Sequence, residues 1–143
     1  MKSIKLLEQI VELRIMLQNI CDGFNTEQFN KQSMLTMDKK VLFVLSKNAD
    51  CPPSKLIETL GIAKSNLALL CKSMVDNGQI SVSKSDLDKR NVFYNITKKG
   101  QEELNQFYCS MANEASLNLN KREQNMIEKR FDEIIEFINK KYK

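Results

Sequence analysis

Histidine is absent from this chain of 143 residues. Imidazole is the commonest general base near neutral pH and the commonest metal ligand, so no His-based triad or His-containing metal site is possible. The sequence offers no other pattern of acids, bases and nucleophiles that is typical of catalysis. We therefore expect a protein that is not an enzyme, with no catalytic residue, no bound metal and no cofactor.

Closely spaced cysteines are also absent. Cys21, Cys51, Cys71 and Cys109 lie far apart, so the chain has no C-x-x-C pair of the kind that binds zinc. Cys21 falls near the end of a predicted helix, where the helix dipole disfavours a thiolate, and Cys71 has a core position. We expect Cys51, in a proline turn, to be accessible and Cys109 to lie on a dimerisation helix. Redox sensing is the less favoured role for these thiols.

Long apolar runs are missing too. None approaches the roughly 20 residues that a membrane-spanning helix requires. The first residues, MKSIKLLEQIVELR, are interrupted by charge too early for a signal peptide. With 42% hydrophobic and 28% charged residues, the composition is typical of one domain with a buried core. We expect a single domain over residues 1–143, in the cytoplasm and not bound to a membrane.

The net charge of +4 is modest, but its distribution is uneven. Residues 35–101 carry eleven Lys or Arg and six Asp or Glu, so the two flanking segments together are close to neutral. A positive middle between neutral arms favours a phosphate-facing module between oligomerisation arms. A merely solvated surface explains the same distribution.

Helical periodicity dominates the first half of the chain. Apolar residues recur at intervals of three and four from Ile4 to Ile20, which predicts a long amphipathic helix that ends near CDGFN. A polar loop, NTEQFNKQS, follows. We expect Thr36 to cap a second helix, MDKKVLFVLSK, which ends at the tandem prolines of NADCPP.

Two further helices form a helix-turn-helix pattern. The segment PSKLIETL starts with a proline in its first turn and ends at Gly61, and KSNLALLCKSMVDN begins three residues later. In this motif the second helix presents its N-terminal residues to the major groove of DNA.

From residue 79 the period changes from helical to alternating. Ile80 and Val82 are expected to share one face of a strand, and Val92, Tyr94 and Ile96 repeat the alternation after a charged loop. Residues 79–97 therefore predict a β-hairpin. Thr97 caps a following helix, and NLN precedes a last helix with a capping box formed by Asn120 and Glu123. The predicted fold is mainly α with a small β-hairpin.

The order helix, helix-turn-helix, charged hairpin and helix is that of a winged helix-turn-helix, and the residues resemble the MarR family of bacterial transcriptional regulators. The matching motifs are LT at Leu35 and Thr36, GIAKSNL, NGQI, DKR at residues 88–90, and ITKKG. They cover residues 35–104 in family order. The DKR motif has lysine where the family usually has the first of two arginines.

The resemblance implies a DNA-binding core over residues 36–100 and dimerisation helices over 1–22 and 101–143. It implies a homodimer on a palindromic operator of double-stranded DNA, and a repressor that a small effector releases. Apolar residues on the terminal helices exceed what a core of this size needs, which also favours a partner. The expected dimerisation residues are Leu7, Ile10, Val11, Ile127, Phe131, Ile134, Ile135 and Ile138.

The expected DNA contacts lie in two places. On the recognition helix they are Lys64, Ser65, Asn66, Ala68, Leu69 and Lys72; on the wing they are Lys84, Lys89 and Arg90, with Asp88 as a brace for the loop. First-turn polar residues can reach base edges, and basic wing residues suit phosphates and a narrow minor groove. Ordinary helix-start chemistry and a solvated hairpin tip explain the same residues without DNA.

Leu69 departs from the family, which usually has a polar or basic residue near that place. This departure, the absent Ser or Thr cap at Ala63 and the modest charge favour an alternative function, a winged-helix protein–protein adaptor that has lost DNA binding. The effector site is unknown: Phe24, Phe29 and Phe43 either line a ligand pocket or belong to the core.

Overall fold

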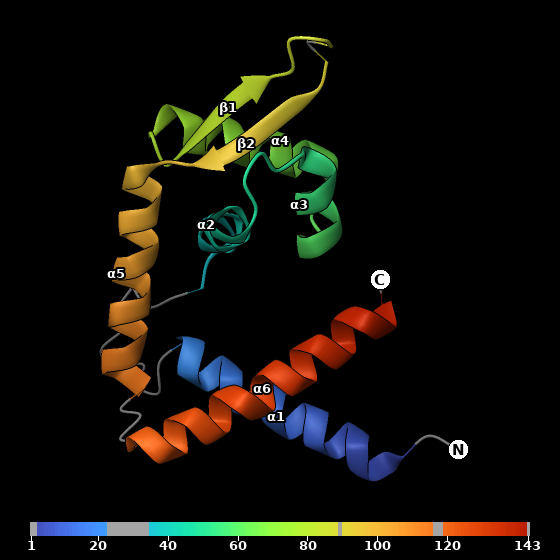
Figure 1. Ribbon diagram of the computed structural model, residues 1–143, viewed down its shortest axis with the longest axis vertical. Helices are drawn as coiled ribbons and strands as arrows, with labels where there is room; N and C mark the ends of the chain where they lie inside the picture. Colours follow the sequence, from blue (N-terminus) through green and yellow to red (C-terminus); the bar gives the residue numbers. More distant parts are fainter. Residues whose placement is uncertain (1–2, 23–34, 89, 116–118, 143) are drawn as a thin grey trace.

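The computed structural model describes residues 3–22, 35–88, 90–115 and 119–142. Within these residues it contains six helices and one two-stranded antiparallel sheet (Figure 1). In chain order they are α1 (Ile4–Asp22), α2 (Met37–Lys47), α3 (Pro53–Leu60), α4 (Lys64–Asp76), β1 (Ile80–Lys84), β2 (Val92–Ile96), α5 (Lys98–Ala115) and α6 (Lys121–Tyr142). The predicted fold class is confirmed. The predicted polar loop, with Phe24 and Phe29, lies outside the described residues.

The core lies where α2, α3, α4, the base of the hairpin and α5 meet. Helix α2 runs through its middle and buries Val41, Leu42, Val44 and Leu45, the face that the helical period predicts. The remaining buried apolar residues are Cys51, Leu56, Leu67, Cys71, Met74, Ile80, Leu104 and Phe107. Because every one of these elements contributes to one cluster, the helix-turn-helix and the wing form a single packed unit.

One helix end follows the expected local chemistry, and another differs in detail. Gly61 ends α3 in the left-handed conformation, with φ of +63°. Thr36 occupies the N-cap of α2 as predicted, but its side chain makes no cap hydrogen bond to the backbone. The hydroxyl donates to the Asp38 carboxylate instead, because that acceptor lies within reach in the first turn.

The hairpin pairs Ile80 with Ile96 and Lys84 with Val92. The expected alternation holds only at the base of the hairpin, where Ile80 is buried; Val82 is 45% exposed. The difference arises because the hairpin extends beyond the body of the protein, so its outer half has less to pack against (Figure 1). Alternation along the strand therefore does not by itself determine whether Val82 is buried.

Cys51 forms an isolated β-bridge with the outer edge of β2. The Cys51 N–H donates to the Tyr94 carbonyl at 2.9 Å, and the Tyr94 N–H donates to the Cys51 carbonyl at 2.8 Å. The pairing covers Cys51, which is only 1% exposed. The prediction that Cys51 is accessible was wrong, because the proline turn is pinned against the sheet.

The base of the wing is tied to the start of α5. Thr97 caps α5 as predicted: its Oγ1 accepts from the Gly100 N–H at 3.1 Å and donates to the Gly78 carbonyl at 2.6 Å. The Lys99 ammonium donates to the Asn77 carbonyl at 2.6 Å, at the C-terminus of α4. A Cβ on Gly100 would overlap the Gln79 carbonyl oxygen. These contacts connect α4, the hairpin and α5 at one junction.

The terminal helices lie at the end of the molecule away from the wing (Figure 1). Helix α1 contacts α5. The capping box of α6 is confirmed, since the Asn120 side chain accepts from the Glu123 N–H at 2.9 Å and the Glu123 carboxylate accepts from the Asn120 N–H at 3.0 Å. None of the helices in the described part of the chain combines the length and the apolar composition of a membrane span.

We predict that Gly100→Ala destabilises the protein by about 3 kcal/mol, the upper end of the usual range for overpacking, because backbone at Gln79 must move. Gly61→Ala is the matched control: it meets open space and adds only left-handed strain, about 1 kcal/mol. Urea unfolding of both variants measures the difference. Equal losses would show that α5 does not pack tightly on the hairpin.

Candidate nucleic-acid interface

Helix α4 has one buried face and one open face. Leu67, Cys71 and Met74, spaced four and three residues apart, are buried in the core. All six residues predicted to contact DNA lie on the rest of the helix surface and are exposed: Lys64, Ser65, Asn66, Ala68, Leu69 and Lys72. The core therefore orients α4 so that this set faces outward.

The centre of the open face is a row formed by Ser65, Leu69 and Lys72, at intervals of four and three residues. Leu69 is 71% exposed, so this apolar side chain is not needed to complete the core. A row of hydroxyl, isobutyl and ammonium groups suits a major groove that presents acceptors, a thymine methyl and phosphates.

The N-terminus of α4 has no side-chain cap. Ala63 occupies the N-cap and makes no side-chain hydrogen bond, in agreement with its residue type. The first backbone N–H groups of a helix have no partner within the helix, and they carry the positive end of its dipole. This end of the recognition helix is thus chemically suited to a phosphate.

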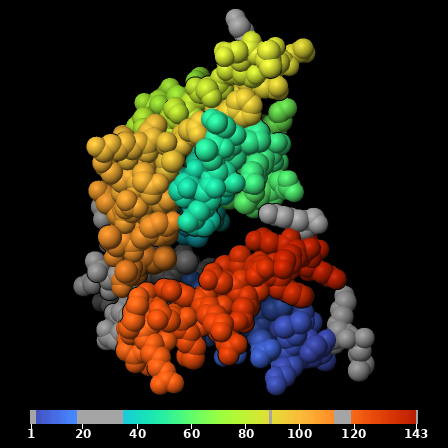
Figure 2. All heavy atoms as spheres, viewed as in Figure 1, coloured from blue at the N-terminus to red at the C-terminus, as the bar shows by residue number. Residues whose placement is uncertain are grey.

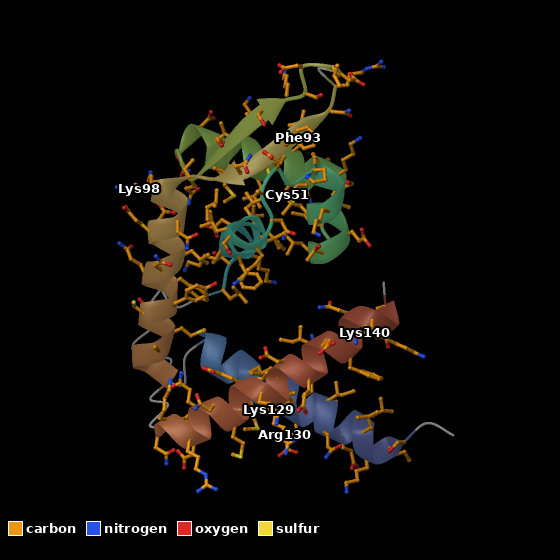
Figure 3. All side chains as sticks on the ribbon, viewed as in Figure 1. Cys51, Phe93, Lys98, Lys129, Arg130 and Lys140 are labelled. Carbon is orange, nitrogen blue, oxygen red and sulfur yellow. The ribbon has the colours of Figure 1, made fainter. Side chains whose placement is uncertain are left out.

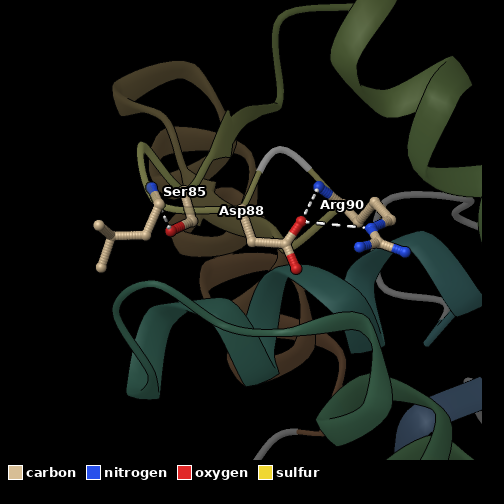
Figure 4. Close-up of polar contacts among 4 residues, drawn as sticks. Ser85, Asp88 and Arg90 are labelled. Carbon is tan, nitrogen blue, oxygen red and sulfur yellow. Dashed lines mark hydrogen bonds and ion pairs between the residues drawn. The ribbon is translucent and has the colours of Figure 1, made fainter.

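The tip of the wing is an ordered turn. The Ser85 N–H donates to the Asn91 carbonyl and the Asn91 N–H to the Asp88 carbonyl, both at 2.9 Å. The Ser85 hydroxyl also accepts from the Leu87 N–H at 3.3 Å (Figure 4). The turn gives the charged loop a fixed shape although it projects into solvent.

Asp88 has the geometry expected of a brace. Its Oδ1 accepts from the Arg90 backbone N–H at 3.0 Å and from the Arg90 Nε at 3.4 Å (Figure 4). The Arg90 side chain remains 94% exposed, so the contact aligns the guanidinium without burying it. Lys84 is exposed at the end of β1, and Lys89 lies outside the described residues. The roles of these residues on DNA remain predictions.

The comparison with family models decides the class of this interface. Residues 39–113, from α2 to α5, match the model of the winged helix DNA-binding domain. The chain belongs to the winged helix DNA-binding domain family. The match includes α4 and the hairpin described above, so the exposed row and the braced tip lie on the recognition helix and wing of this family.

Solved structures extend the likeness of this winged helix protein to its terminal helices. A MarR-like transcription regulator from Bacillus cereus is 26% identical, with 93% of this chain and 95% of that chain covered and a TM-score of 0.58. BpsR from Bordetella bronchiseptica is 17% identical, with 88% and 98% covered and a TM-score of 0.60. A mutant MarR from Escherichia coli in complex with operator DNA is 18% identical, with 92% and 94% covered and a TM-score of 0.55.

These findings confirm the resemblance to the MarR family. The protein is a DNA-binding transcriptional regulator of the MarR type, which favours the regulator over the adaptor among the functions that the sequence left open. None of the curated proteins matches this chain closely in sequence.

Two thiols of this winged helix protein are held in the core. Burial raises the pKa of the Cys51 and Cys71 thiols. A raised pKa keeps a thiol protonated and weakly nucleophilic. Cys109 is exposed on α5, and the side chain of Cys21 lies outside the described residues. Neither buried thiol has the properties of a redox sensor.

Phe43 lines a pocket rather than the interior of the core. The pocket has a volume of about 390 Å³ and lies among α2, α3 and α5. Figure 2 shows the surface hollowed between α2 and α3 on one side and α6 on the other. The lining residues are Leu35, Lys40, Phe43, Val44, Thr59, Leu60, Phe107, Tyr108 and Met111.

The bridge between Cys51 and Tyr94 was not predicted from the sequence, and neither were the side chains beside it. Asp50 and Asn95 form two mutual hydrogen bonds across the edge of β2. The NADCPP stretch signals a turn, but nothing in it indicates that its partner lies 45 residues further along the chain. A long-range pair of this kind has no periodic signature.

We predict that Arg90→Ala weakens binding to a duplex that the full-length protein selects from a random library. The dependence of log K on log salt should flatten by about 0.9, the value for one phosphate-equivalent contact. Arg130→Ala on α6 is the control, because that side chain pairs with Glu133 at the end of the molecule away from the wing (Figure 3). An unchanged slope for Arg90→Ala would contradict a wing contact.

Proposed function

We propose that the protein is a homodimeric repressor that binds a roughly palindromic operator and is released by a small effector. The observation that carries the proposal is the open face of α4, where the Ser65–Leu69–Lys72 row begins beside a helix N-terminus with no side-chain cap. Residues 36–100 would form the DNA-binding core of each subunit. Residues 1–22 and 101–143 would supply the dimerisation helices.

The chemistry of each side chain indicates which part of the DNA it would contact. Ser65, Asn66 and Leu69 would meet base edges in the major groove, and Lys64 and Lys72 would meet phosphates on either side. Arg90, aligned by Asp88, would enter the flanking minor groove, with Lys84 and Lys89 adding phosphate charge. The E. coli MarR mutant, a structural neighbour, has been solved with operator DNA.

Exposed apolar surface on the terminal helices supports a dimer. Helix α6 has no buried residue, and the predicted dimerisation residues of α1 that lie in the described segment are about half exposed. On α6, Phe131, Ile134, Ile135 and Ile138 are exposed at intervals of three, one and three. An apolar stripe of this length is removed from water when two subunits pack their arms together.

A twofold dimer places its two recognition helices in successive turns of the major groove when half-sites lie about 34–36 Å apart. Such an isologous arrangement requires the operator to be approximately palindromic. Anything that changes the spacing of the two helices then lowers affinity for both half-sites together.

The pocket at Phe43 supports an effector with an apolar, flat body. Phe43, Leu60 and Phe107 offer apolar contacts, and Lys40 lines the pocket with the aliphatic part of its side chain. Its volume of about 390 Å³ falls within the range of small-molecule sites. BpsR, a structural neighbour, has its DNA binding regulated by 6-hydroxynicotinic acid, an aromatic acid.

Ile134→Glu should yield a monomer, because it places a charge within the apolar stripe of α6. A monomer has only one recognition helix, so its affinity for the selected duplex should be lower by about 100-fold or more. Sedimentation and a mobility-shift assay measure the two effects. Lys129→Glu, which also adds a negative charge on α6, is the control and should remain dimeric; a dimeric Ile134→Glu variant would refute the interface.

Met111→Trp should fill the pocket and abolish the response to aromatic acids while DNA binding persists. Benzoate and 6-hydroxynicotinate serve as probes, and fluorescence anisotropy of a labelled duplex gives the affinity at each concentration. The proposal expects at least one probe to release DNA from the unaltered protein. A Met111→Trp variant that responds as strongly would place the effector elsewhere.

A further inference from the structure

The wing is held to the helix-turn-helix by an unusual pair of side chains on the outer edge of β2. The Asp50 backbone N–H donates to the Asn95 Oδ1 at 2.8 Å, and the Asn95 Nδ2 donates to the Asp50 Oδ1 at 2.9 Å. Asp50 has φ of +48°, a left-handed conformation that Asp tolerates better than most residues. The chain thus adopts an uncommon backbone shape at the point where it meets Asn95.

The position of this pair connects three elements. Asp50 precedes Cys51, which pairs with Tyr94 through two backbone hydrogen bonds, and Pro53 then begins α3. Asn95 sits in β2 opposite Ser81 of β1. Figure 3 shows Cys51 beside β2, at the inner end of the hairpin. The hydrogen bonds therefore join the start of the helix-turn-helix to the strand that leads back from the wing tip.

Stability alone gives a weak account of the pair. Both hydrogen bonds are exposed, so water competes for the same donors and acceptors, and their net contribution to folding is small. The outer half of the hairpin, by contrast, packs against little, as the exposed Val82 indicates. The hydrogen bonds between Asp50 and Asn95, here called the clamp, lie near the base of this projecting hairpin and therefore determine where its tip lies.

We infer that Asn95 is a positioning residue for DNA binding: by clamping Asp50 and Cys51 to β2, it fixes the placement of Arg90 at the wing tip relative to the recognition helix α4. The inference rests on the proposed function in that Arg90 and α4 must both contact DNA. When the clamp opens, α4 still meets the major groove, and the wing contact is the one that weakens.

Exchanging the two side chains tests the clamp. Asn95→Asp alone sets two carboxylates against each other. In the double variant Asp50→Asn with Asn95→Asp, the carboxylate at position 95 can accept from both the backbone N–H and the side-chain amide of position 50, so two hydrogen bonds are again possible. We expect Asn95→Asp to lower affinity for the selected duplex about five- to tenfold, and the double variant to recover to within about twofold. Asn105→Asp on α5, where an exposed asparagine accepts a hydrogen bond from the Gln101 side chain, is the control.

A merely structural role for Asn95 is distinguished by combining the change with Arg90→Ala. If the clamp acts through Arg90, Asn95→Asp costs less than about twofold once Arg90 is gone, because the two changes remove the same contact. Effects that multiply would overturn the inference, as would a double exchange that fails to restore affinity while the thermal midpoint is normal.

Amide hydrogen exchange in the free protein tests the clamp in the absence of DNA. The Ser85 and Asn91 amides of the wing tip should exchange faster in Asn95→Asp and return to the original rate in the double exchange, with α2 and α5 unchanged. Unchanged wing exchange in Asn95→Asp overturns the inference. If the wild-type protein selects no duplex at all, the proposed function fails, and the positioning role fails with it. The exchange rates still show in that case whether the clamp exists.

Discussion

The recognition helix, the wing and α5 meet at one junction, and its geometry places α4 and the base of the wing relative to each other. Gly100 packs so closely on the Gln79 carbonyl that no side chain fits there. The Thr97 hydroxyl donates to the Gly78 carbonyl and accepts from the Gly100 N–H, and Lys99 donates to the Asn77 carbonyl at the end of α4. Backbone meets backbone at this point, so the start of α5 is packed directly against the segment that follows α4.

Under the proposed function, this close packing gives the terminal helices a means of controlling DNA binding. Helix α5 runs from the junction toward α1 and α6, and it also forms one wall of the pocket at Phe43 (Figure 1). A change in the packing of the terminal helices, or a ligand between α2, α3 and α5, would then tilt α5 and carry α4 with it. A packed core transmits such a shift rather than absorbing it.

How far sequence predicts this protein depends on the range of the interaction. The helices around Gly61, Thr97 and Asn120 followed from local caps and apolar periodicity, which need only neighbouring residues. Local signals did not predict the burial of Cys51 or the pair between Asp50 and Asn95, because both depend on β2, far away in the chain. They did not predict the exposure of Val82 either, because it depends on how far the hairpin extends from the body of the protein. For the interface, the exposed residues of α4 were predicted from the family resemblance and the chemistry of the first helical turn, whereas the clamp behind the wing had no sequence signal.

The most direct measurement is a footprint of the full-length protein on its selected duplex, read in both grooves. The proposed function predicts two blocks of major-groove protection one helical turn apart, each flanked by minor-groove protection that disappears when Arg90 is replaced by alanine. Two such blocks would locate α4 and the wing on each half-site. Protection without this spacing, or protection that is the same with and without Arg90, would contradict the assignment of α4 and the wing as the DNA-binding elements.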